Sequence, residues 1–173
     1  ELDYKDYVTR DILRSAQFPL LGANVQLSVD NIDKPLPYVV FETVEGYTIA
    51  VLGLTTGQAQ GVEIEPPAAM RDYLYLRGQH NVLVALTHIG YANDVKLAEE
   101  FNEIDVIIGG HTHTLLNPAE IVNGVLIAQA GGHFHQINPD YPKFLGVVRI
   151  VLEDGIVVSK TGKVLVFQPQ ENP

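Results

Sequence analysis

Residues 82–114 read VLVALTHIGYANDVKLAEEFNEIDVIIGGHTHT, and this stretch decides the fold. Two apolar runs of strand length, Val82 to Leu86 and Ile104 to Ile108, flank a segment from Asp94 to Phe101 whose apolar residues recur at helical spacing. A strand, a helix and a second strand in this order are the signature of a βαβ unit with a buried parallel pair. The stretch therefore predicts an α/β fold.

The segments on either side are predicted to extend this unit. A helix is expected over 3–17, a short strand over 18–25, and a hairpin made of 38–44 and 47–54. Another helix is expected from Pro66 to Arg77, with Gly78 as its left-handed cap. Further strands are predicted over 124–130, 145–152, 156–159 and 163–167, with a tight turn at 153–155. Residues 1–167 then form one domain or part of one, and the polar residues 168–173 form a linker or tail.

The composition restricts the classes of function. With 173 residues, of which 46% are hydrophobic, the chain is long enough to bury one sizeable core. A net charge of -10 argues against a nucleic-acid polymer as partner. The chain has no cysteine, so its chemistry must come from His, carboxylate, hydroxyl or amide groups. Its apolar runs are far shorter than the roughly 20 residues that span a bilayer, so no membrane span is expected.

Histidines near the ends of the predicted strands are the candidate functional residues. His88 follows the first apolar run, and His111 follows the second run and the glycines at 109 and 110. Ligands bind beyond the carboxyl ends of strands in open α/β sheets, so both imidazoles are expected at one edge. The glycines would let the backbone turn sharply, and in an extended segment His113 would project from the same face as His111. Converging imidazoles predict a site for Zn, Mn, Fe or Co, and the alternative is a solvated turn.

Other polar residues have simpler interpretations. His80 precedes a strand and is expected to be a loop imidazole in water. His133 and His135 lie in a glycine-rich segment, which favours a mobile loop with exposed imidazoles over an extension of the site. Glu99 and Glu100 are neighbours on a helix and do not face each other, so a solvated face is favoured over a general-acid pair.

The segments LTHIGY at 86–91 and IDVIIGGHTHT at 104–114 resemble, in order and spacing, the second half of the catalytic domain of 5'-nucleotidase-type metallophosphoesterases. Residues 18–25, 51–56 and 128–131 are similar to further segments of that family, so the resemblance covers about residues 1–152. The chain departs from the family pattern after Gly131, where an insertion contains His133 and His135. Neither of these histidines has a role in the family.

The resemblance implies part of a four-layer α/β/β/α sandwich with mixed sheets, whose N-terminal portion is missing from this chain. It implies two divalent metal ions, with His88 and His111 as ligands of one ion and His113 as a ligand of the other. Asp3 matches the residue that orients a catalytic histidine in the family, and that histidine would precede Glu1. The family's D-x-H, G-D-x-x-D and G-N-H ligand motifs are not complete in these 173 residues.

The resemblance further implies a hydrolase that cleaves phosphate esters of nucleotides in a periplasmic or extracellular location. The chain alone is expected to bind one metal ion or none, and to be inactive without the remainder of its catalytic domain. Two alternatives stay open at this point. One is a non-catalytic binding module on the same fold. The other is a mononuclear zinc site formed by His88, His111 and His113.

Overall fold

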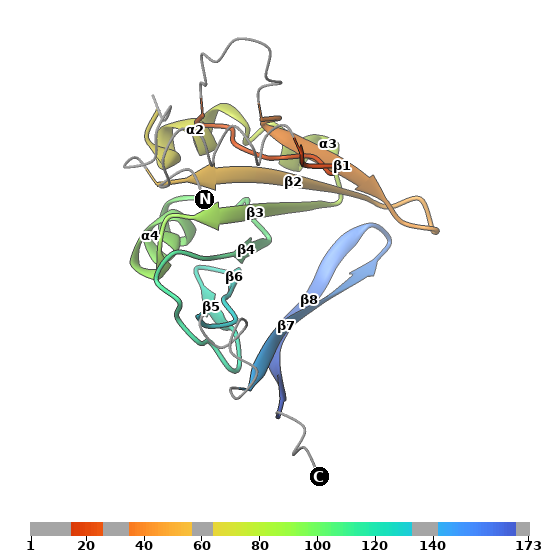
Figure 1. The fold of residues 1–173 in the computed structure, drawn as a ribbon. Coiled ribbons are helices and arrows are strands. Elements are labelled where there is room, and N and C mark those ends of the chain that lie inside the picture. Colours follow the sequence, from red (N-terminus) through yellow and green to blue (C-terminus); the bar gives the residue numbers. More distant parts are fainter. Residues whose placement is uncertain (1–14, 26–34, 57–63, 133–141, 169–173) are drawn as a thin grey trace.

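The computed structural model describes residues 15–25, 35–56, 64–132 and 142–168. Its helices are α2 (Pro66–Asp72), α3 (Leu76–Gln79) and α4 (Tyr91–Glu100). Its strands are β1 (Tyr38–Glu42), β2 (Thr48–Thr55), β3 (Val82–His88), β4 (Val106–Ile108), β5 (Glu120–Val122), β6 (Val125–Ala128), β7 (Lys143–Glu153) and β8 (Ile156–Phe167). Figure 1 shows how these elements are arranged.

A six-stranded mixed sheet forms the centre of the molecule, in the order β1-β2-β3-β4-β6-β5. The four inner strands β2, β3, β4 and β6 run parallel, and the edge strands β1 and β5 are antiparallel to their neighbours. The chain passes from β3 through α4 to its parallel neighbour β4, so the predicted βαβ unit and the α/β class are confirmed. Strands β7 and β8 pair with each other in a separate antiparallel sheet.

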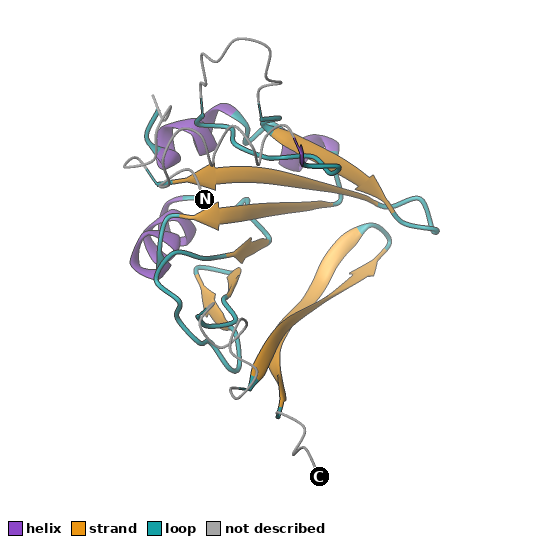
Figure 2. Ribbon diagram, viewed as in Figure 1, coloured by secondary structure: helices purple, strands orange, loops and turns teal. Residues whose placement is uncertain are grey.

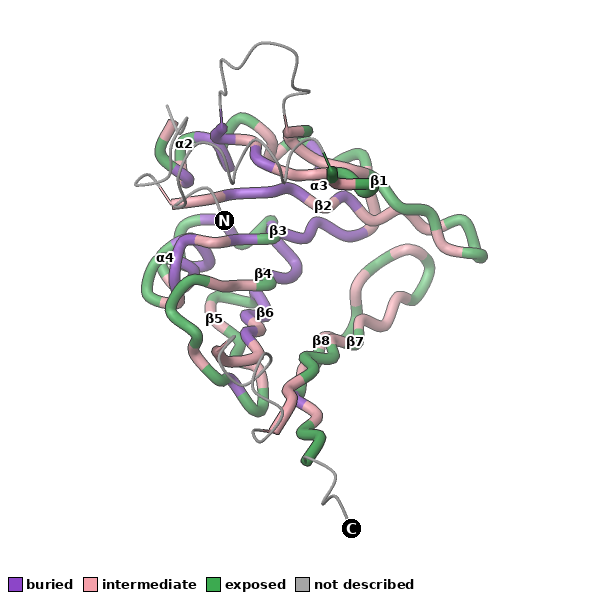
Figure 3. The backbone as a smooth tube through the Cα atoms, viewed as in Figure 1, coloured by how far each residue is buried: buried purple, intermediate pink, exposed green. Residues whose placement is uncertain are grey.

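Side chains alternate along β3, and this alternation separates two layers of core. Leu83 and Ala85 pack on the face covered by the three helices. Val82 and Val84 lie on the other face, where they pack with Val148 and other residues of the β7–β8 hairpin. Figure 2 shows the helices and the hairpin on opposite sides of the sheet, and Figure 3 shows that burial is concentrated in the strands between them. The described residues thus supply one helical layer and two sheets, and the four-layer arrangement stays a prediction.

The predicted single helix up to Arg77 is wrong, because the structure has two helices, α2 and α3. The break falls at Tyr73, whose ring packs edge-on against Tyr38 at a centroid distance of 6.0 Å. This tertiary contact favours a turn over helix continuation. Gly78 lies inside α3 without a positive φ, so it is not the predicted left-handed cap.

Three further differences concern the strands and helix ends. Helix α4 begins at Tyr91, three residues before the prediction, and β8 is one continuous strand where two were expected. Within 18–25, Leu21 forms only an isolated bridge with Leu36. Residues 3–14 of the predicted first helix lie outside the described residues.

Two hairpin turns contain the pairs Asn123-Gly124 and Asp154-Gly155, in which all four residues have positive φ. Such backbone angles suit the tight turns that join antiparallel strands, and Gly accepts them most readily. The Asp154 turn confirms the prediction, and β7 and β8 end and start on either side of it. The Asn123 turn joins β6 to β5, a strand that the sequence analysis missed although its Asn-Gly signal is local.

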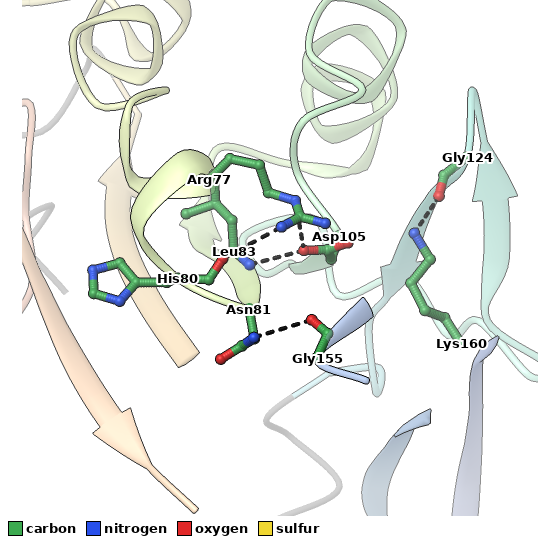
Figure 4. A network of polar contacts seen from close by, with 8 residues as sticks. All are labelled: Arg77, His80, Asn81, Leu83, Asp105, Gly124, Gly155 and Lys160. Carbon is green, nitrogen blue, oxygen red and sulfur yellow. Dashed lines mark hydrogen bonds and ion pairs between the residues drawn. The ribbon is translucent and has the colours of Figure 1, made fainter. Parts of the chain in front are cut away.

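Polar contacts join the β7–β8 hairpin and helix α3 to the amino end of β3 (Figure 4). Asp105 accepts a hydrogen bond from Leu83 N at 2.9 Å and pairs with Arg77 Nε at 3.4 Å. Asn81 Nδ2 donates to Gly155 O at 3.0 Å, which ties the β7–β8 turn to the main sheet. His88 and His111 lie at or just beyond the carboxyl ends of β3 and β4, at the opposite edge of the sheet. None of the helices in the described residues is long and apolar enough to cross a bilayer.

Candidate metal centre

His88 and His111 meet at the carboxyl ends of the parallel strands β3 and β4. His88 is the last residue of β3, and Leu86 is in register with Ile108, the last residue of β4. The chain then needs only Gly109 and Gly110 to reach His111. The two imidazole rings lie edge to face, with centroids 5.0 Å apart. The structure therefore brings together two of the three histidines that the sequence singled out.

The glycines before His111 provide space on opposite faces of the sheet. A Cβ at position 110 would lie 3.2 Å from His88 Nδ1, and a Cβ at position 109 would lie 2.3 Å from Asp94 Oδ2. Neither glycine has a positive φ. The expectation that they let the backbone turn sharply is therefore wrong, since both serve close approach of a neighbouring side chain.

The sharp turn is made by the histidines themselves. His111 has a φ of 75° and His113 a φ of 54°, both in the left-handed region that is uncommon for residues other than glycine. The segment is therefore not extended, and the argument that placed both imidazoles on one face does not hold. The side chain of His113 lies against Gly132, where an added Cβ would come within 3.2 Å of the His113 Cβ.

The donor set formed by the described residues is partial. Within residues 15–25, 35–56, 64–132 and 142–168, no three His, Cys, Asp or Glu side chains form a group that could hold a metal ion. The separation of the two imidazole rings can nevertheless be compared with that of two ligands on one ion. Two rings bound through metal–nitrogen bonds of about 2.1 Å that meet at about 100° have centres about 5 Å apart. The observed separation of 5.0 Å fits that arrangement.

A buried carboxylate lies on the face of the sheet opposite His88. Thr87 Oγ1 donates a hydrogen bond to Asp94 Oδ1 at 2.6 Å, and both residues are buried. Asp94 Oδ2 is buried and has no hydrogen-bond partner among the described residues. Burial raises the pKa of Asp94 to about 6, and the hydrogen bond from Thr87 opposes this rise in pKa. The carboxylate thus sits beside both strand ends without reaching the imidazoles.

Gln129, directly after β6, ties down the loop that carries His111 and His113. Its Nε2 donates to Gly110 O at 2.7 Å, and its Oε1 accepts from Thr114 N at 2.5 Å. Thr112 Oγ1 in turn accepts from Tyr91 N at 3.0 Å, which joins this loop to the start of α4. The residues that flank His111 and His113 in this loop are Gly110, Thr112 and Thr114, and each is therefore held by a polar contact.

Sequence reasoning did not assign roles to Thr87, Asp94, Thr112 or Gln129. A weak signal was present, since each is a polar residue within or beside a segment predicted to be buried. Buried polar groups are usually hydrogen-bonded, so each of these residues was expected to have a partner. Apart from the contact between Thr112 and Thr114, their partners lie between 7 and 21 residues away, so the pairing could not be predicted from the sequence.

The remaining sequence candidates lie elsewhere. His80 lies in the loop before β3, as predicted, but it is half-buried and its Nδ1 is 3.2 Å from Thr48 Oγ1, so water is not its sole neighbour. Glu99 and Glu100 are exposed on α4, as predicted for a solvated face. Asp3, His133 and His135 lie outside the described residues.

Comparison with known proteins supports the resemblance drawn from the motifs. The chain is 29% identical to the trifunctional nucleotide phosphoesterase protein YfkN of Bacillus subtilis over 97% of its own length and 13% of that protein. It is 34% identical to the uncharacterized metallophosphoesterase YunD of the same organism, over 70% of this chain and 28% of the relative. No family model matches the chain.

One solved structure is similar to the chain in both fold and sequence. The 5'-nucleotidase precursor from Thermus thermophilus superposes with a TM-score of 0.74 and 27% identity, over 92% of this chain and 36% of that protein. The chain thus spans about a third or less of the length of these three proteins. By sequence and by fold it is a relative of the 5'-nucleotidases and other metallophosphoesterases, and it corresponds to one part of their longer chains.

Proposed function

We propose that the protein containing this chain is a hydrolase of nucleotide phosphate esters that depends on divalent metal ions. The observation that carries the proposal is the His88–His111 pair, held 5.0 Å apart at the shared carboxyl edge of β3 and β4. Imidazole pairs at such an edge are suited to transition metals. The names of the relatives supply the substrate class, since one is a nucleotide phosphoesterase and another a 5'-nucleotidase precursor.

In this proposal His88 and His111 hold one ion and His113 contributes to a second. Bound ions of this kind polarise the phosphoryl group and lower the pKa of a bound water. The chain's own residues hold the imidazoles in place: Gly110 leaves room for His88, and Gln129 fastens the loop on either side of His111. The remaining ligands come from outside the described residues, as expected for a chain that matches only part of its relatives.

The charge of the chain is consistent with this assignment. With a net charge of -10, this chain repels a phosphate at long range, so bound cations must supply the local attraction. We propose Zn, Mn, Co or Fe as the ions and a small nucleotide as the substrate. The word "precursor" in the name of the Thermus relative agrees with a periplasmic or extracellular location, which we propose for this protein as well.

Phosphate release from a nucleoside monophosphate tests the proposal in the protein as its gene encodes it. The metal-stripped enzyme should regain turnover with one of these ions, and His88→Ala or His111→Ala should lower kcat/KM by at least about 10²-fold. His80→Ala is the matched control, because that imidazole is bonded to Thr48 at the far end of β3. Absence of metal-dependent turnover with all four ions would contradict the proposal.

Metal counting separates the two alternatives from this function. Two ions per chain support the dinuclear site, whereas one ion supports a mononuclear zinc site. Nucleotide binding without turnover would identify a non-catalytic module on the same fold. The isolated 173 residues should give no turnover, since the described part offers only two converging imidazoles.

A further inference from the structure

We propose that Asp94 is a positioning residue that sets the distance between His88 and His111 by holding the ends of β3 and β4 together. Its importance for metal binding rests on the proposed function. Its effect on the separation of the imidazoles rests on the structure alone.

Asp94 contacts a residue at the end of β3 and the residue just after β4. Its Oδ1 accepts the Thr87 hydroxyl at 2.6 Å, and Thr87 directly precedes His88 in β3. Its Oδ2 lies where a Cβ at position 109 would approach within 2.3 Å, just after the last residue of β4. One carboxylate therefore accepts a hydrogen bond from the residue before His88 and packs against the glycine that follows β4.

Successive side chains of a strand point to opposite faces, so contacts on one face of β3 affect the position of the imidazole on the other face. Leu83, Ala85 and Thr87 share the helix face of β3, so His88 points to the opposite face. In the second segment, position 109 faces Asp94 and position 110 faces His88. A rotation at Thr87 or a shift at Gly109 would thus move His88 relative to the His111 loop.

The burial of the carboxylate indicates that Asp94 is not placed there by its hydrogen bonds alone. Asp94 is fully buried at 0% exposure, and Oδ2 has no hydrogen-bond partner in the described part of the chain. A buried oxygen without a donor costs free energy, and such groups in native proteins call for an explanation. A rigid contact with both strand ends supplies one.

Gln129 and Tyr91 do not replace this function. Gln129 bonds to residues 110 and 114, which lie in the His111 loop rather than in β3. Tyr91 N, at the start of α4, donates to Thr112 in the same loop. This bond does not involve Thr87, the residue whose rotation would move His88. Removal of the Asp94 carboxylate should therefore loosen the spacing of the imidazoles while the His111 loop stays intact.

The test compares Asp94→Ala and Asp94→Asn in the protein as its gene encodes it. Two readouts are used: the Kd for Co²⁺, and the nuclear Overhauser effect between the imidazole protons of His88 and His111 in the metal-free protein. Asp94→Ala should raise the Kd about 10- to 100-fold, as outer contacts of metal ligands do, and should abolish the imidazole contact. Asp94→Asn keeps the shape and the acceptor for Thr87, so it should restore both readouts to within about threefold.

Asp105→Ala is the matched control, since Asp105 is also buried and also accepts a hydrogen bond from β3, but at the opposite edge. It should lower stability and leave both readouts unchanged. Wild-type affinity and an intact imidazole contact in Asp94→Ala would overturn the proposal, as would equal losses in Asp105→Ala. If the wild-type protein binds no Co²⁺, the proposed function fails, and the imidazole contact still decides whether Asp94 positions the pair.

Discussion

Asp94 in the first turn of α4 and Gly109 just after β4 are in contact, so closely that a Cβ on residue 109 would lie 2.3 Å from Asp94 Oδ2. The contact joins the first turn of a helix to the end of a strand 15 positions later in the sequence. It leaves room for glycine alone at position 109, and it places a buried carboxylate behind the candidate metal centre.

Gly109→Ala should destabilise the protein by about 1–3 kcal/mol, because the new methyl group overlaps Asp94 and the structure around it is close-packed. Urea unfolding measures the loss. In the Asp94→Ala background the same substitution should cost much less, since the overlapping oxygen is gone. Gly78→Ala is the control: a Cβ there meets nothing within 4 Å, and it should stabilise the protein by about 0.4–1 kcal/mol. Equal costs of Gly109→Ala in both backgrounds would show that the carboxylate is not the obstacle.

Gly110→Ala should act on metal binding more than on stability. The added Cβ would lie 3.2 Å from His88 Nδ1 and 3.4 Å from Thr87 O, so the imidazole must move by a few tenths of an ångström. We expect the Kd for Co²⁺ to rise about 10-fold or more, as for other contacts next to a ligand. Isothermal titration measures this Kd. A variant with wild-type affinity would indicate that His88 does not bind the ion through its present orientation.

The stability of the folded chain should depend on pH through Asp94. Burial raises the folded-state pKa of this carboxyl to about 6, from an ordinary value of 3.8. Between these values the folded state binds more protons than the unfolded state, so the contribution of Asp94 to stability is full below about pH 4 and is lost as the pH rises through 6. The total change is about 3 kcal/mol at 1.36 kcal/mol per pKa unit.

Chemical denaturation of wild type and Asp94→Asn between pH 4 and 8 checks this dependence. The free energy of unfolding of the wild type should fall relative to that of Asp94→Asn as the pH increases, with no further change above about pH 7. Thr87→Val should extend to higher pH the range over which the free energy of unfolding falls, because the Thr87 hydrogen bond lowers the pKa of Asp94. Parallel pH profiles of wild type and Asp94→Asn would contradict the raised pKa.

Asp105→Ala should cost about 1–3 kcal/mol of stability, because Leu83 N–H would lose its buried acceptor. The ion pair with Arg77 adds little, since the Arg77 side chain is 34% exposed. Thermal unfolding monitored by circular dichroism measures the change. Arg77→Met is the comparison and should cost well under half as much, and the opposite ranking would mean that the ion pair dominates.

Asp3→Ala should leave metal content intact and lower kcat for nucleotide hydrolysis by roughly 10² or more in the protein as encoded, if Asp3 orients a catalytic histidine. The effect on stability should not exceed about 1 kcal/mol, the usual contribution of a helix N-cap. Steady-state kinetics together with metal analysis checks both parts. Wild-type kcat in this variant would show that residues 1–3 do not correspond to the family's third ligand motif.

Apolar pattern alone was sufficient to predict the centre of the fold. The runs around 82–86 and 104–108 are local signals for buried parallel strands, and the intervening segment has helical spacing. From this pattern it follows that His88 and His111 lie at one edge, since parallel neighbours end on the same side. The Asn123-Gly124 turn was equally local, and its hairpin was predictable.

Contacts between distant residues decided the rest. Helix α2 ends where Tyr73 meets Tyr38, and the pair of glycines before His111 is explained by Asp94 on one face and His88 on the other. The direction of His113 follows from left-handed backbone angles that no residue type dictates. By itself the sequence determined the central strands β3 and β4 and the ends at which His88 and His111 stand, because the spacing of apolar residues and the length of a run are properties of a single segment. Only the tertiary structure decided which side chains touch, because each contact depends on how two separate segments pack.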